Sequence, residues 1–89
     1  MERPWEVDTS VTFQHRLGKS ASELGYSRDS RDCPDIWELS NGDVAIVGRD
    51  VTEHFSRGLP DGVSVGSDER LVVIPGTMLR AAKSDIPDL

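Results

Sequence analysis

The sequence has few of the residues that cross-link small folds or anchor a chain in a membrane. A single cysteine, Cys33, excludes an internal disulfide. No apolar run approaches the length of a membrane-spanning helix, since the longest runs, residues 44–47 and 71–74, are strand-sized. The first residues contain no apolar stretch of signal-peptide type, so we expect a cytoplasmic protein.

Positive charge is also scarce. The chain has 16 Asp and Glu against 10 Lys and Arg, for a net charge of −6 and a pI of about 4.7. This balance, with scattered basic residues, argues against direct binding of nucleic acid. Nine acids lie in residues 1–45 and seven in residues 46–89, which is typical of a solvated surface. An acidic decoy for a nucleic-acid-binding protein is kept as an alternative.

What is present is one small domain of 89 residues and 9.8 kDa. A chain this short buries only a small core, and it shows no disulfide framework or metal motif to compensate. We therefore expect a protein partner or a second copy of the chain, as a homodimer, to contribute to its stability. Residues 33–84 are predicted to form the structural core, and residues 1–15 a strand or a flexible arm. The strand is favoured because apolar residues alternate along residues 5–13.

The strongest local signal is a hairpin around Asn41-Gly42, which lies between two β-type runs. Asn-Gly favours a type I′ turn, which needs positive φ at both central residues. This turn predicts that Leu39 faces Val44 and that Trp37 faces Ile46, with all four side chains on one buried face.

Several further elements are predicted from local patterns. Ser20 and Glu23 have the spacing of a capping box, and Gly25 limits any helix there to one turn. Asp50 and Glu53 predict a second box that opens a short helix ending at Gly58. Turns are expected at residues 59–63 and 66–69, with a short edge strand at residues 63–65 between them.

The last third of the chain predicts a strand and a helix. Residues 71–74 are apolar throughout, which favours a central strand covered on both faces. Pro75 then suits the first position of a final helix. The fold class expected is α+β, with a small, mainly antiparallel sheet of three or four strands and a C-terminal helix packed on one face. The predicted core is Trp37, Leu39, Val44, Ile46, Leu71, Val73, Met78 and Leu79.

The inventory of reactive groups is short. Cys33, His15 and His54 are the usual nucleophile, base or soft-ligand candidates, and no catalytic constellation surrounds them. One Cys and two distant His do not have the spacing of a zinc site, so no metal or other cofactor is predicted. A small enzyme using Cys33 or His54 is kept as an alternative to a non-enzymatic protein.

Five short motifs occur in a characteristic order: residues 19–22, Cys33, residues 36–39, residues 44–50 and residues 71–75. Their order resembles a large family of small actinobacterial proteins of unknown function, often encoded beside helix-turn-helix regulators and related to a developmental regulator of sporulating bacteria. The resemblance covers residues 19–83. Gly48 is an additional residue, the stretch 51–68 is longer than usual, and the final helix lacks the family's aromatic residues.

The resemblance implies a regulatory or toxin–antitoxin-type role through protein contacts, with no catalytic residues to carry over. We therefore expect a non-enzymatic interaction module whose partner is a protein such as a helix-turn-helix transcriptional regulator. The contact residues predicted on the hairpin and the long loop are Glu38, Arg49, Asp50 and His54.

Overall fold

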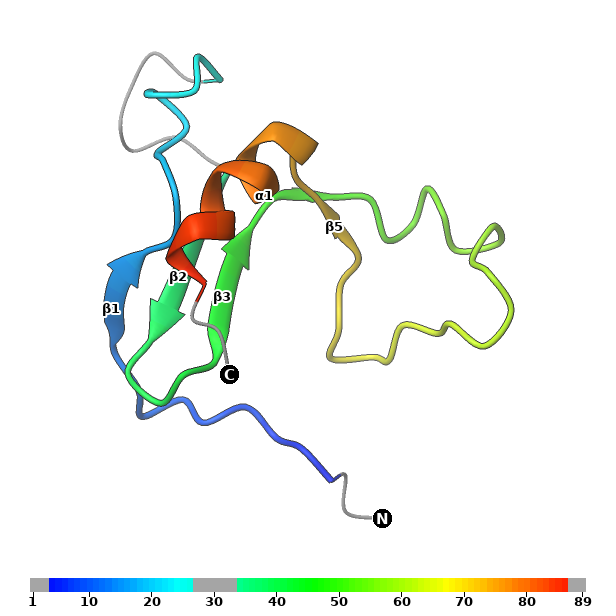
Figure 1. Ribbon diagram of the computed structural model, residues 1–89. Helices are drawn as coiled ribbons and strands as arrows, with labels where there is room; N and C mark the ends of the chain where they lie inside the picture. Colours follow the sequence, from blue (N-terminus) through cyan, green and yellow to red (C-terminus); the bar gives the residue numbers. More distant parts are fainter. Residues whose placement is uncertain (1–3, 27–33, 87–89) are drawn as a thin grey trace.

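The computed structural model describes residues 4–26 and 34–86. Two antiparallel sheets and one short helix make up its regular structure (Figure 1). The first sheet has the order β1-β2-β3, and the second pairs β4 with β5. The strands are β1 (Phe13–Arg16), β2 (Asp35–Leu39), β3 (Val44–Val47), β4 (Arg49–Asp50) and β5 (Val72–Val73). Helix α1 (Gly76–Ala82) and a 3₁₀ turn, η1 (Lys83–Asp85), follow, so the predicted α+β class with a mainly antiparallel sheet is confirmed.

The hairpin between β2 and β3 is confirmed, but the predicted turn type and register are wrong. The Leu39 N–H donates to the Asp43 carbonyl at 2.8 Å, and the Gly42 N–H donates to the Leu39 carbonyl at 3.0 Å. Gly42 has φ of 90°, whereas Asn41 does not have positive φ. The connection therefore has three residues and ends in a left-handed glycine. This extra residue shifts the pairing by one position, so that Ile36 lies opposite Ile46.

The shifted register reverses β2 relative to β3, so that Ile36 and Glu38, and not Trp37 and Leu39, share a face with Val44 and Ile46. Ile36 is 3% exposed and packs with Leu17, Met78 and Ala82, which places its face against α1. Trp37 lies on the opposite face and is half-buried. Of the eight predicted core residues only Met78 is buried, while the exposed ones are Val44, Ile46, Val73 and Leu79. The actual buried hydrophobic residues are Leu17, Ala21, Ile36, Met78 and Ala82.

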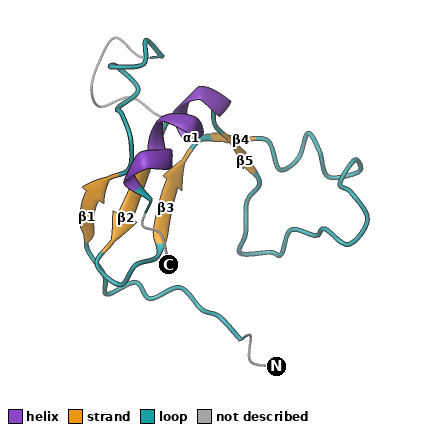
Figure 2. Cartoon of the chain, in the orientation of Figure 1, coloured by secondary structure: helices purple, strands orange, loops and turns teal. Residues whose placement is uncertain are grey.

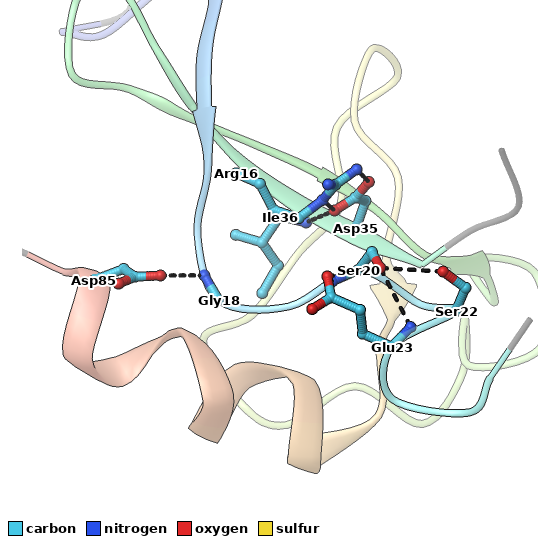
Figure 3. Close-up of polar contacts among 8 residues, drawn as sticks. All are labelled: Arg16, Gly18, Ser20, Ser22, Glu23, Asp35, Ile36 and Asp85. Carbon is cyan, nitrogen blue, oxygen red and sulfur yellow. Dashed lines mark hydrogen bonds and ion pairs between the residues drawn. The ribbon is translucent and has the colours of Figure 1, made fainter. Parts of the chain in front are cut away.

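Residues 17–25 connect the sheet to the helix through polar contacts (Figure 3). The predicted capping box is confirmed, because the Ser20 N–H donates to Glu23 Oε1 at 3.1 Å and the Glu23 N–H donates to Ser20 Oγ at 3.2 Å. The Gly18 N–H donates to Asp85 Oδ2 at 2.7 Å, which ties this segment to the end of η1. Arg16 and Asp35 form a two-pronged ion pair across β1 and β2, at 2.8 and 3.0 Å.

The strand predicted at residues 5–13 is wrong over most of its length. Residues 4–12 form no regular strand, and Trp5 and Val7 are 62% and 61% exposed. Strand β1 begins at Phe13 instead. Its only continuation toward the N-terminus is at Thr12, whose carbonyl accepts from the Ser40 N–H at 2.9 Å.

The segment between β4 and β5 also departs from prediction. Residues 52–57 form consecutive turns, so the expected short helix is wrong, and residues 63–65 form no strand. The turns at residues 60–63 and 66–69 are confirmed by the Val63 N–H to Pro60 carbonyl bond and the Glu69 N–H to Gly66 carbonyl bond. Residues 71–74 contribute only the two-residue β5, which is exposed and pairs with β4 alone. Figure 2 shows the loop leaving β4 and returning to β5 at one side of the molecule.

Helix α1 follows the prediction with one adjustment. Pro75 is its N-cap, in extended conformation, rather than its first helical residue. Arg80 lies in the last turn, where a cation is favourable. Cys33 and Pro87 lie outside the described residues.

Candidate functional site

A groove with a volume of about 890 Å³ lies beside β4 and β5. We call it the loop groove. The groove is lined by residues of β4 and β5, by the turns that follow β4 and by Arg70. The lining residues are Arg49, Asp50, Val51, Thr52, Glu53, His54, Phe55, Arg70 and Val73.

A small hydrogen-bond network closes the base of the long loop. Asp50 Oδ1 accepts from the Thr52 N–H at 3.0 Å and from the Thr52 hydroxyl at 2.7 Å. The Leu71 N–H in turn donates to Thr52 Oγ1 at 2.8 Å, and the Val51 N–H donates to the Leu71 carbonyl at 2.9 Å. These hydrogen bonds hold Val51 and Thr52, at the start of the long loop, against Leu71 at its end, without the short helix that was predicted.

The carboxylate of Asp50 is kept ionised by these contacts. The Thr52 hydroxyl and then the Thr52 N–H lower the pKa of Asp50 below its ordinary value, and the charge of Arg70 acts in the same direction. Arg70 Nε lies 3.8 Å from Asp50 Oδ2, and both side chains are well exposed. Within the described residues Arg49 has no ion-pair partner. The groove therefore offers one paired and one available arginine.

An aromatic pair lines the groove. The rings of His54 and Phe55 meet edge to face, with centroids 4.7 Å apart and an angle of 84° between their planes. Phe55 remains 42% exposed and Val73 49% exposed. Apolar surface is thus accessible between charged side chains, which is the arrangement of a protein contact surface with a charged rim.

The loop groove is open to water. Val51 and Thr52 are half-buried and the other lining residues are exposed. Sites for small molecules enclose most of the ligand surface, and catalytic groups gain their strength from exclusion of water. The geometry therefore suits contact with another macromolecular surface better than conversion of a small substrate.

Three of the four predicted contact residues come together here. Arg49, Asp50 and His54 line the loop groove, whereas Glu38 does not. Glu38 lies in β2, where its Oε1 is 3.4 Å from Nδ1 of His15. Sequence reasoning missed Phe55, Arg70 and Val73 as lining residues. Phe55 lies in the stretch predicted as a short helix, and Val73 was assigned to the core. An aromatic residue within a polar loop was the signal that could have indicated a surface role.

A second exposed surface lies on the face of the three-stranded sheet opposite α1. Phe13 is 63% exposed and meets Trp37 edge to face, with ring centroids 5.8 Å apart. The guanidinium carbon of Arg16 lies 4.8 Å from the centroid of the Trp37 ring. We call Phe13, Arg16 and Trp37 the aromatic face. Because Trp37 was predicted to lie in the core, this surface was not predicted.

Comparison of the chain with protein-family models, with curated proteins and with solved structures finds no match. In residues 4–26 and 34–86 no helix combines the length and apolar character needed to cross a bilayer. The same residues contain no cluster of three His, Cys, Asp or Glu side chains placed to hold a metal ion.

Proposed function

We propose that this chain is a non-enzymatic protein-interaction module of the bacterial cytoplasm, and that its partner is a regulatory protein of the helix-turn-helix or toxin–antitoxin type. The observation that carries the proposal is the amount of apolar surface left exposed. Among the residues that the structure describes, five hydrophobic residues are buried, whereas thirteen large hydrophobic side chains are exposed. A chain with so much apolar surface outside its core gains stability when a partner covers part of it.

The loop groove is the surface that best fits such a partner. The exposed apolar side chains of Phe55 and Val73 line this groove together with the charged Arg49 and Arg70. A protruding apolar side chain of the partner would contact Phe55, and a carboxylate beside it would meet Arg49. The partner class itself follows from the family resemblance of the motifs, whereas the groove supplies the contact residues.

The proposal is tested by isothermal titration of the purified chain with the helix-turn-helix regulator encoded nearest to it. We expect stoichiometric binding, and we expect Phe55→Ala to weaken it by roughly tenfold or more, because aromatic anchors dominate interface energies. Lys83→Ala is the matched control, since Lys83 is exposed on η1 and does not line the groove. Binding that Phe55→Ala and Lys83→Ala leave equally strong would exclude the groove. The absence of binding by the wild-type chain would exclude this class of partner.

A further inference from the structure

A second, smaller hollow adjoins the loop groove. It has a volume of about 170 Å³, and we call it the small hollow. Its lining residues are Tyr26, Pro34, Gly48, Arg49, Val73 and Pro75. Arg49 and Val73 also line the loop groove, so the two hollows meet at this pair of side chains. Figure 2 shows β4 and β5, which carry the pair, between α1 and the long loop.

The pairing of β4 with β5 holds the two shared side chains next to each other. Arg49 lies directly opposite Val73 in the antiparallel ladder. Residues in this relation project from the same face of a sheet and lie within contact distance. Both residues are exposed. A cationic side chain therefore stands beside an exposed apolar one where the two hollows meet.

Each hollow also offers an exposed aromatic ring. Phe55 in the loop groove is 42% exposed, and Tyr26 in the small hollow is 44% exposed. The Tyr26 hydroxyl is hydrogen-bonded to Thr77 Oγ1 in α1, so the polar end of this ring already has a partner. An apolar cavity of about 150 Å³ holds one benzene molecule. The small hollow therefore suits a single apolar side chain, whereas the loop groove has room for several residues.

The charges around the two hollows define where an acidic group fits. Asp50 and Arg70 lie 3.8 Å apart and offset each other. Arg49 and Glu53 have no ion-pair partner among the described residues. Arg49 attracts a carboxylate to the place where the hollows meet, and Glu53 disfavours one farther along the loop groove. Charge complementarity thus gives one acidic position, and it lies between two apolar positions.

We propose that the two hollows together bind an extended segment of the partner protein, in which one Asp or Glu contacts Arg49 and is flanked by two apolar side chains. One apolar side chain enters the loop groove and the other enters the small hollow. Alternate side chains of an extended segment point to the same side, so the segment reads apolar, any residue, acid, any residue, apolar. The inference rests on the proposed function, because it specifies the chemistry of the segment that the regulatory partner presents.

The charge of the segment is tested with the full chain and synthetic peptides, by fluorescence polarisation. The probe is a labelled peptide of Gly and Ser in which a Glu has a Leu two positions before it and another two positions after it. We expect it to bind roughly tenfold more tightly than the same peptide with Lys in place of Glu. The variant Arg49→Glu should reverse this preference, and such a reversal cannot come from a loss of folding. A Glu peptide that binds no better than the Lys peptide, or does not bind at all, would overturn the proposal.

The part played by the small hollow is tested by Tyr26→Ala. We expect this variant to bind the peptide with two Leu roughly fivefold more weakly, because one apolar side chain loses its contact surface. A peptide with one Leu, which the larger loop groove takes, should bind the variant and the wild type equally, and this also shows that the variant is folded. Tyr26→Phe is the matched control, since it keeps the ring and should bind both peptides as the wild type does. If Tyr26→Ala weakened both peptides equally, or neither, the small hollow would not take part and the proposal would be wrong.

The peptide titrations and the titration with the regulator fail separately. If the regulator binds and Phe55→Ala weakens it, but the Glu and Lys peptides bind equally, the proposed function stands and the present inference is overturned. If the Glu peptide is preferred and the regulator does not bind, the inference stands and the partner belongs to another class of protein.

Discussion

The three-stranded sheet with α1 and the segment from β4 to β5 contain similar apolar sequence, yet only the first is packed. Ile36 in β2 and Met78 in α1 are 3% and 0% exposed. By contrast, no residue from 49 to 73 is buried, and the two valines of β5 are 37% and 49% exposed. Burial therefore follows from the elements that lie against a residue, and apolar composition alone does not decide it.

Under the proposed function, this difference separates the region that stabilises the fold from the region that contacts a partner. The packed region holds the buried cluster, the Arg16–Asp35 ion pair and the contact between Gly18 and Asp85. The open region is held by short-range bonds of Asp50, Thr52 and Leu71, and it lines the loop groove. Segments of this second kind open at low cost in free energy, which is common among binding loops.

The largest effect is expected from Met78→Ala, which truncates the fully buried side chain at the centre of the packed region. Removal of such a side chain leaves a cavity and should lower the free energy of unfolding by about 3 kcal/mol. Leu79→Ala is the control on the same helix, because Leu79 is 55% exposed, and it should cost about 0.5 kcal/mol or less. Urea unfolding followed by tryptophan fluorescence measures both. Equal losses would mean that α1 does not pack as described.

Two glycine substitutions, one in the packed region and one in the long loop, compare the two regions directly. Gly18 has φ of 79°, and a Cβ there would lie 2.8 Å from the Ala82 backbone nitrogen. Gly18→Ala should therefore cost roughly 2 kcal/mol or more, through backbone strain and displacement of α1. Gly58 in the long loop has open space around its Cβ position, and its φ is not in the left-handed region. Gly58→Ala should leave the free energy of unfolding within about 0.5 kcal/mol of wild type.

Thermal unfolding of the two variants measures this contrast. A Gly58→Ala variant as destabilised as Gly18→Ala would show that the long loop is packed as tightly as the first sheet.

Local signals in the sequence predicted the packed region well in outline. Asn41-Gly42 identified the hairpin, Ser20 and Glu23 the capping box, and Pro75 the start of the helix. These motifs act through backbone geometry and neighbouring hydrogen bonds, so they need no knowledge of the tertiary fold. The face of β2 was nevertheless predicted wrongly, because one additional turn residue shifts the register, so that Ile36 and not Trp37 shares the face of Ile46.

The open region could not be predicted in the same way. An unbroken apolar run at residues 71–74 favours a central strand when no information on neighbouring elements is available. In the structure β5 pairs only with the two residues of β4, so its valines remain on the surface. Arg49, Asp50 and His54 were grouped correctly because they are close in sequence. Arg70 and Val73 join them only through the pairing of β4 with β5.

A smaller effect with a clear pH dependence is expected from the ion pair of the packed region. Burial raises the pKa of Asp35, but hydrogen bonds from Arg16, Trp37 and the Ile36 N–H, together with the charge of Arg16, outweigh it, so that the pKa lies below its ordinary value. A lowered pKa stabilises the fold above the unfolded value of about 3.9, and this contribution is lost as the pH falls through the folded value. Asp35→Asn should therefore cost about 1 kcal/mol near neutral pH and progressively less in acid.

Urea titrations of wild type and Asp35→Asn at neutral and acidic pH test this sign. Asp61→Asn, in an exposed turn of the loop, is the control and should follow wild type at both pH values. A difference between wild type and Asp35→Asn that grows in acid would contradict the assigned direction of the shift.

The smallest effect on global stability, and the most informative for the open region, is expected from Thr52→Val. The substitution keeps the shape of the side chain but removes the hydroxyl that donates to Asp50 and accepts from the Leu71 N–H. No residue from 49 to 73 is buried, so we expect β4 and β5 to separate without unfolding of the first sheet, and the global free energy of unfolding should fall by about 0.5 kcal/mol or less. Exchange of the Leu71 amide should instead accelerate roughly three- to tenfold. The pKa of Asp50 should rise toward its ordinary value, because its largest stabilising contact is lost.

Ser56→Ala provides the matched control, since the Ser56 hydroxyl donates to the Glu53 carbonyl within the same loop and does not contact Leu71. It should leave the Leu71 exchange rate and the Asp50 pKa unchanged. If Thr52→Val lowered the global free energy of unfolding as much as Met78→Ala does, the two regions would unfold as one cooperative unit. The loop groove would then be part of the stable core and not a surface that opens and closes on its own.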